Sequence, residues 1–99
     1  MIDYLILGGG SAGCVLAARL SEDPEKQVYL IEAGRDISAQ TMPPAIRSRY
    51  PGRAYLDVSN IWKSLTAFMG QRANASRRYE QARILGGGSA INALMTNRG

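Results

Sequence analysis

The chain has 99 residues, of which 45% are hydrophobic, 20% charged and 7% aromatic, a composition typical of ordinary globular proteins. It contains one cysteine and no histidine, which excludes an internal disulfide, Ser-His-Asp and Cys-His catalytic sites, and histidine metal sites within the chain. No apolar run approaches the ~20 residues that span a bilayer, and Met1-Ile2-Asp3 lacks the basic start of a signal peptide. We therefore expect a cytoplasmic protein that does not enter the membrane.

Charge and glycine are unevenly distributed along the chain. Residues 1–34 carry two basic and five acidic groups, a net −3, whereas residues 35–99 carry ten basic and three acidic groups, a net +7. A basic second half suits nucleic acid, an anionic cofactor or an acidic partner surface, and charge alone does not choose among them. Seven of the eleven glycines fall at positions 8–10, 13 and 86–88. Glycines clustered in this way indicate backbone that turns tightly or is approached closely.

The first third of the chain reads as a strand, a helix and a second strand. The uninterrupted apolar run Tyr4–Leu7 is typical of a parallel strand. From Ser11 the apolar residues recur at helical spacing, until the segment 21–24 ends the helix with a proline. A second strand follows at Val28–Ile31. These elements predict a right-handed βαβ unit over residues 1–34.

Beyond this unit the pattern is weaker. We expect irregular, exposed backbone with a helical turn near Ala45, then a short amphipathic helix between Ile61 and Met69, in which Trp62 is a packing residue. Residues 74–78 read as a polar surface loop and residues 81–85 as an extended segment. Ser89 is expected to cap a helix that begins at Ala90 and continues to Met95.

The segment 8–13 is a G-x-G-x-x-G motif placed between the first strand and the helix, which is the context that favours dinucleotide binding. In such a motif Gly8 allows the tight turn, Gly10 lets the backbone approach a pyrophosphate, and Gly13 lets the helix pack on the sheet. Glu32, nineteen positions after Gly13, is placed to accept ribose hydroxyls and to repel the 2′-phosphate of NADP. The structural alternative is a plain strand-to-helix turn, with Glu32 as a solvated carboxylate. Cys14 reads as a small buried apolar residue.

A second glycine motif occupies residues 82–92, where three successive glycines precede Ser89. Consecutive backbone N–H groups at a helix start can cradle an anion or a ring edge, and Asn92 offers both a donor and an acceptor. A flexible loop that caps a helix explains the residues equally well. The pattern alone leaves both interpretations open.

Residues 3–21 and 31–34 resemble the N-terminal FAD-binding segment of the glucose–methanol–choline oxidoreductases, and residues 82–92 with Arg98-Gly99 are similar to that family's first signature. The resemblance implies an FAD-dependent oxidase or dehydrogenase that acts on the CH–OH group of an alcohol. It also implies a set of cofactor-binding residues, grouped as pyrophosphate, ribose and flavin contacts. These are Gly8, Gly10, Ser11, Ala12 and Gly13, then Glu32 and Ala33, then Gly88, Asn92, Ala93 and Met95.

The chain departs from the family in three respects. Gly88 and Ala93 stand where members often have serine or glycine, and Thr96 replaces a commoner aromatic residue or alanine. Ile91 occupies the position at which some members tether the flavin through a histidine, so the resemblance implies non-covalent FAD. Members are several times longer, and their catalytic histidine lies near the far C-terminus. We therefore expect no catalytic residue in this chain, which then needs the remainder of the oxidoreductase as its partner. The chain is either a fragment or truncated reading frame of such an enzyme, or one piece of a chain that is cleaved and stays assembled.

The predicted fold class is α/β, an incomplete Rossmann-like FAD-binding βαβ unit with an irregular basic second half. Residues 1–99 would form the N-terminal part of an FAD-binding domain, divided into the unit 1–34 and the segment 35–99 that carries the second glycine motif. Two strands and one helix cannot cover both faces of a parallel sheet, which also indicates a missing part. One alternative is a fragment of an NAD-binding dehydrogenase. A non-enzymatic basic module is another, although no recognisable nucleic-acid reader accompanies the arginines.

Overall fold

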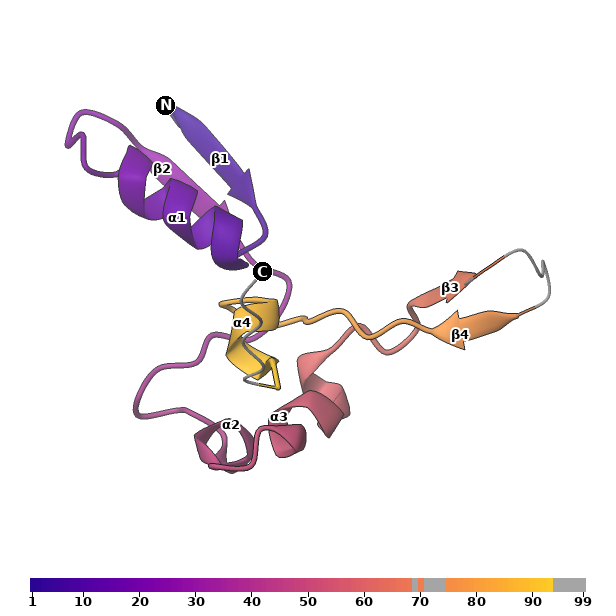
Figure 1. The fold of residues 1–99 in the computed structure, drawn as a ribbon. Helices are drawn as coiled ribbons and strands as arrows, with labels where there is room; N and C mark the ends of the chain where they lie inside the picture. Colours follow the sequence, from indigo (N-terminus) through magenta and orange to yellow (C-terminus); the bar gives the residue numbers. More distant parts are fainter. Residues whose placement is uncertain (69, 71–74, 94–99) are drawn as a thin grey trace, which may run out of the picture.

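The computed structural model describes residues 1–68, 70 and 75–93. Its N-terminal part is the expected βαβ unit, in which β1 (Tyr4–Leu7) and β2 (Val28–Ile31) are parallel and α1 (Ser11–Leu20) connects them (Figure 1). The register pairs Tyr4 with Val28 and Leu7 with Ile31. The predicted fold class, an incomplete Rossmann-like α/β unit, is confirmed.

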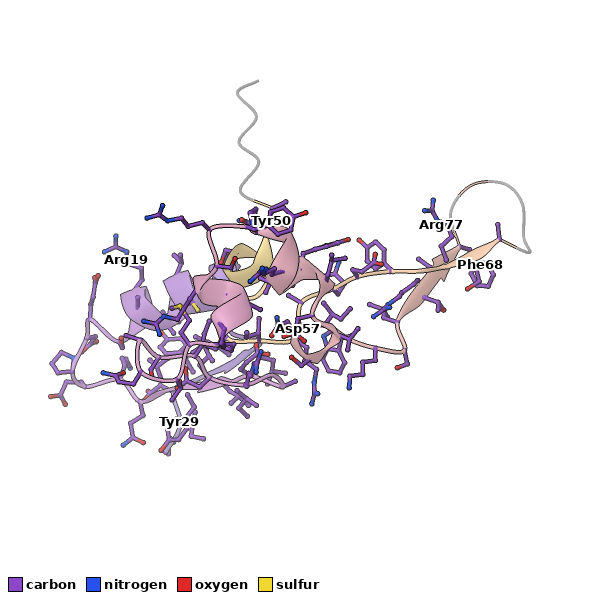
Figure 2. All side chains as sticks on the ribbon, turned by 90° about the horizontal axis from the view of Figure 1, so that it is seen from below. Arg19, Tyr29, Tyr50, Asp57, Phe68 and Arg77 are labelled. Carbon is purple, nitrogen blue, oxygen red and sulfur yellow. The ribbon has the colours of Figure 1, made fainter. Side chains whose placement is uncertain are left out.

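Only one face of this two-stranded sheet is covered by α1. Ile6 and Leu30 are half-buried, and a side chain at Gly13 of α1 would come within van der Waals contact of Ile6. The opposite face carries exposed apolar side chains, and Figure 2 shows Tyr29 pointing away from α1. The exposed residues on this face are Leu5, Leu7, Tyr29 and Ile31. Within the described residues, the expected lack of covering elements is thus observed.

The second half consists of short elements joined by loops. After β2 the chain forms α2 (Pro44–Arg47), α3 (Gly52–Leu56), the 3-10 helix η1 (Val58–Asn60), β3 (Thr66–Phe68), β4 (Ser76–Arg78) and α4 (Gly88–Ile91). α2 confirms the helical turn expected near Ala45. None of the described helices is long and apolar enough to cross a membrane.

The helix expected between Ile61 and Met69 is wrong for the described residues, because Thr66–Phe68 is a strand. The loop expected at 74–78 is likewise wrong for Ser76–Arg78, which pairs antiparallel with β3. The two strands form a hairpin that projects from the rest of the molecule (Figure 1). Backbone pairing between two segments, rather than the apolar spacing within one of them, decides the structure here.

The helix start at the second glycine motif also differs from the expectation. Gly87, not Ser89, is the N-cap of α4, and the Ser89 hydroxyl donates to the carbonyl oxygen of Gly86 at 2.6 Å. α4 ends at Ile91, and Asn92 is extended. Met95, which the prediction placed in this helix, lies outside the described residues.

The hydrophobic core lies in the second half of the chain rather than in the βαβ unit. Its buried apolar residues are Ala54, Ile61, Ile84 and Ile91. Asn60 is also fully buried, and its side chain donates to the carbonyl oxygen of Ala54 at 3.0 Å and accepts from the guanidinium of Arg35. A buried amide with satisfied donor and acceptor fixes the path of the surrounding loops.

Candidate functional site

The core brings the second glycine motif onto the first. Ile84, fully buried, forms a parallel bridge with Arg35 just after β2, and the Leu85 N–H donates to the Arg35 carbonyl oxygen at 3.0 Å. The next residue, Gly86, donates its N–H to the carbonyl oxygen of Gly9 at 2.6 Å. The two glycine clusters are therefore in direct backbone contact, although the first ends at Gly13 and the second begins only at Gly86.

The contact between the two loops requires glycine. A Cβ built on Gly87 would lie 2.8 Å from the Cα of Gly10, closer than real Cβ atoms approach backbone. Gly87 also has a φ of +58°, a conformation that L side chains rarely adopt. Close packing of one loop on the other therefore explains Gly87, the middle glycine of the triplet, and a flexible capping loop would not need it.

A cleft of about 510 Å³ lies where the two loops meet the carboxyl ends of β1 and β2. This volume is within the usual range for small-molecule and cofactor sites, and the carboxyl end of a parallel sheet is where such folds bind nucleotides. Five predicted cofactor-binding residues line it, namely Gly8, Gly10, Glu32, Ala33 and Gly88. The other lining residues are Leu7, Ile31, Trp62, Gln81, Ala82, Ile84 and Gly87.

Glu32 at the end of β2 links the cleft to the glycine loop. Its Oε2 accepts from the N–H of Gly9 and its Oε1 from the N–H of Gly34, both at 2.7 Å. A carboxylate has about four acceptor positions, so each oxygen can still accept a hydroxyl from the cleft. The half-buried Glu32 therefore orders the first glycine loop and presents negative charge to a bound ligand.

The site fits the pyrophosphate of a dinucleotide. A Cβ on Gly8 or on Gly88 would meet no protein atom within 4 Å, although both residues line the cleft. The cleft therefore has open space directly beside the backbone of these two glycines. Gly10, the N-cap of α1, gives no side-chain cap, and the first turn of α1 holds no acidic residue. The N–H groups and positive dipole end of α1 remain available to an anion.

The remaining predicted site residues lie at different distances from the cleft. Ser11, Ala12 and Gly13 line a neighbouring cavity of about 600 Å³ that shares Gly8 and Gly10 with the cleft. A Cβ on Gly13 would lie 1.9 Å from the Gly8 carbonyl oxygen, which accounts for that glycine by helix packing. Asn92 and Ala93 follow α4, are exposed and do not line the cleft. Met95 lies outside the described residues.

Trp62 and Gln81 are cleft residues that the sequence did not indicate. They are adjacent because Ile61 bridges Ala82 and the Trp62 N–H donates to the Gln81 carbonyl oxygen at 2.9 Å. No local motif marks such a pairing. Cys14 is half-buried rather than buried, and its thiol donates to the Gly9 carbonyl oxygen at 3.2 Å. The described residues contain no cluster of three or more metal-ligating side chains of His, Cys, Asp or Glu.

Comparison with known proteins identifies relatives that match nearly the whole chain. The profile of the NAD(P)-binding Rossmann-like domains matches residues 6–71. A 5-(hydroxymethyl)furfural oxidase of a Methylovorus strain is 43% identical over 105 residues, which cover 100% of this chain and 20% of that protein. An oxygen-dependent choline dehydrogenase of Staphylococcus epidermidis is 43% identical over 104 residues. This match covers 98% of this chain and 17% of the dehydrogenase.

Solved structures give the same result at the level of the fold. Pyridoxine 4-oxidase from "Mesorbium loti" superposes with a TM-score of 0.71 and 35% identity, covering 100% of this chain and 19% of that one. An FAD-dependent oxidoreductase from Chaetomium thermophilum superposes with a TM-score of 0.72 and 32% identity, covering 100% and 16%. The chain thus spans at most a fifth of the length of these proteins.

Proposed function

The chain belongs to the NAD(P)-binding Rossmann-like domain family and, by its relatives, to the glucose–methanol–choline oxidoreductases, and on this premise we propose that residues 1–99 bind FAD as the N-terminal part of an oxidoreductase acting on alcohols. The observation that carries the proposal is the meeting of the two glycine loops beside Glu32. One loop leaves the N–H groups at the start of α1 without a side-chain cap, and the other, from the far end of the sequence, lines the same cleft with Gly87 and Gly88.

In this proposal each part of the cofactor has its own group of residues. The N–H groups at the start of α1 and the glycine loop hold the pyrophosphate, and Glu32 with Ala33 holds the adenosine ribose. Gly88, which lines the cleft, is assigned to the flavin. Asn92, Ala93 and Met95, which follow it in the sequence, are assigned to the flavin as well. When bound, FAD supplies an acceptor for the hydride of an alcohol carbon. The chain's own residues bind and orient it.

The remaining parts of the proposal concern the whole protein. The chain spans 20% of the furfural oxidase and 17% of the choline dehydrogenase, so the catalytic base and the substrate pocket are assigned to the remainder of the protein. Residues 1–34 are the dinucleotide-binding unit, and residues 35–99 carry the second flavin-contacting motif. The substrate is a small-molecule alcohol, and FAD is held without a covalent bond.

The direct test is the identity of the bound nucleotide. The full-length protein that contains residues 1–99 is purified, its absorbance is recorded, and the nucleotide released by denaturation is identified chromatographically. We expect the yellow absorbance of a flavin and released FAD. A colourless protein that binds NAD or NADP in calorimetry would instead support the NAD-binding alternative and refute the proposal.

A variant pair tests whether Glu32 has the assigned role. Glu32→Gln keeps the size of the side chain but removes the charge and one acceptor oxygen, so FAD affinity should fall about tenfold, ~1.4 kcal/mol. The matched control is Glu22→Gln, which changes a carboxylate exposed beside Arg19 and should leave the affinity unchanged. Equal affinities for FAD in the two variants would contradict a ribose contact at Glu32.

A further inference from the structure

Arg35, three positions after Glu32, joins two parts of the chain that lie far apart in the sequence. Its Nη2 donates to the side-chain oxygen of Asn60 and, at 3.3 Å, to the hydroxyl of Ser59. The same nitrogen lies 3.9 Å from Oδ2 of Asp57. The side chain of Arg35 therefore holds the turn that contains η1 against the segment that follows β2.

Asn60 connects this turn to the extended segment 82–86. It is fully buried, and its backbone carbonyl oxygen accepts the N–H of Arg83 at 2.7 Å. Its side-chain nitrogen donates to the carbonyl oxygen of Ala54 at 3.0 Å. A buried amide that loses such partners leaves polar groups unsatisfied, which is costly. A change in the position of Asn60 should therefore move the segment with it.

The same segment also packs tightly on the backbone that follows β2. A Cβ built on Gly34 would lie 2.2 Å from the carbonyl carbon of Arg83, so no side chain fits between the two backbones. The N–H of Leu85 donates to the Arg35 carbonyl oxygen at 3.0 Å, and the N–H of Gly86 donates to the first glycine loop. A shift of the segment would thus change the contact between the two glycine loops.

Arg35 acts from outside the cleft. It is not among the described residues that line the cleft, and its guanidinium contacts side chains of residues 57–60. In other dinucleotide-binding folds an arginine near this position binds the 2′-phosphate of NADP. Any effect of Arg35 on a ligand in this cleft must instead pass through the backbone that it positions.

From this arrangement we propose that Arg35 is a positioning residue of the cofactor site, whose side chain fixes the second glycine motif against the first by way of Asn60. The inference rests on the proposed function, because the nucleotide held between the two loops is there assigned as FAD. Backbone that is fixed before the ligand arrives loses little further conformational entropy on binding. Removal of the guanidinium should therefore weaken FAD binding although it removes no contact to FAD.

The first experiment compares the full-length parent protein with Arg35→Gln, which removes the charge and most of the donors of the guanidinium. Backbone hydrogen exchange is followed by mass spectrometry with FAD in excess. We expect faster exchange in peptides that contain residues 83–86 and unchanged exchange in peptides from β1 and α1. Equal acceleration in all peptides would mean that Arg35 stabilises the fold only as a whole, and no acceleration would mean that it does not hold the segment. Either result would overturn the proposal.

The second experiment measures the dissociation constant of FAD for the same proteins by fluorescence titration. Arg35→Gln should weaken FAD binding about tenfold. The matched control is Arg19→Gln, which makes the same chemical change in an exposed ion pair with Glu22 on the surface of the βαβ unit. This control should leave the FAD affinity and the exchange of residues 83–86 unchanged. If Arg35→Gln binds FAD as tightly as Arg19→Gln does, the proposal is wrong.

The outcomes separate this inference from the proposed function. If the parent protein binds no FAD, the proposed function fails, and the exchange of residues 83–86 still decides whether Arg35 positions the second motif. If the parent protein binds FAD and Arg35→Gln binds it equally well, only the role of Arg35 is wrong. Should Arg35→Gln not fold, Arg35→Lys, which keeps the charge but lacks the planar fork of donors, takes its place. Faster exchange at residues 83–86 with weaker FAD binding would support the proposal, and parent values of both would overturn it.

Discussion

The N–H of Gly86 donates to the carbonyl oxygen of Gly9 at 2.6 Å, and this hydrogen bond joins the two glycine motifs across nearly the whole chain. Gly9 is buried, and its own N–H donates to Glu32. One short loop is thus fixed by β2 on one side and by the second motif on the other. A backbone held in this way can present N–H groups to a ligand without reorganising.

Two neighbouring glycines in the second motif should respond differently to alanine. Gly87→Ala places a Cβ 2.8 Å from the Cα of Gly10 at a φ of +58°, so the loops must move apart. We expect a loss of about 2 kcal/mol in the free energy of unfolding, measured by urea denaturation, together with weaker FAD binding.

Gly88→Ala is the matched variant. Its Cβ meets no protein atom within 4 Å, and Gly88 lies in α4, so stability should stay the same or rise slightly. Because Gly88 lines the cleft, FAD affinity should nevertheless fall about tenfold, ~1.4 kcal/mol. Equal loss of stability in the two variants would mean that the contact between Gly87 and Gly10 does not support the fold.

The βαβ unit could be predicted because its signals are local. The apolar run of β1, the glycine turn and the spacing of α1 each specify their own element. The pairing of Thr66 with Arg78 has no such signal, since it depends on two polar or weakly apolar segments that pair with each other. The apolar residues of this region do recur at helical spacing, but the helix that this spacing predicts does not form at Thr66–Phe68.

The candidate site divides along the same line. Gly8, Gly10 and Glu32 follow from a motif whose spacing reflects the geometry of a single strand–helix–strand unit. Trp62 and Gln81 reach the cleft only through the bridge between Ile61 and Ala82, which sequence spacing does not encode. The triplet that contains Gly87 is evident in the sequence, but its position as the N-cap of α4 and its close contact with the backbone of Gly10 are seen only in the structure.

Asp57 should make the stability of the second half depend on pH. Hydrogen bonds from the Ser59 hydroxyl and backbone N–H, at 2.7 and 2.9 Å, hold the pKa of Asp57 below its ordinary value of 3.8, with the charge of Arg35 contributing. A lowered folded-state pKa gives a contribution that is present above pH ~4 and is lost as the pH falls through the folded value. Protonation of Asp57 should therefore contribute to the decrease in the free energy of unfolding at acid pH.

Asp57→Asn isolates that component, because asparagine caps a helix about as well as aspartate but does not titrate. The free energies of unfolding of the parent protein and the variant, measured by urea denaturation, should differ most at neutral pH. There the variant should be less stable by up to about 1 kcal/mol, and this difference should shrink below pH ~4. Asp36→Asn, at an exposed position, serves as the control. A constant difference at all pH values would assign the effect to capping rather than to charge.

The isolated 99-residue chain should be unstable and inactive toward alcohols. Among the residues that the structure describes, the buried core has only four apolar members. The uncovered face of the sheet exposes Leu5, Leu7, Tyr29 and Ile31, and α1 exposes Val15 and Leu16. Exposed apolar area of this kind promotes association. We expect strong binding of a hydrophobic dye, a broad thermal transition and no alcohol-dependent dye reduction. A sharp cooperative melt with such activity would contradict this prediction.

FAD should leave the full-length protein on acid denaturation. Ile91 occupies the position at which some members of the family carry a tethering histidine, and it is buried in the core with Ile61 and Ile84 rather than facing the cleft. None of the described residues that line the cleft is a histidine, cysteine or tyrosine, and the thiol of Cys14 donates a hydrogen bond to the Gly9 carbonyl oxygen. Retention then depends on hydrogen bonds and packing, which are reversible. Acid precipitation should release the yellow cofactor into the supernatant, whereas a flavin-bearing peptide mapped to residues 82–99 would show that a covalent bond forms in this segment.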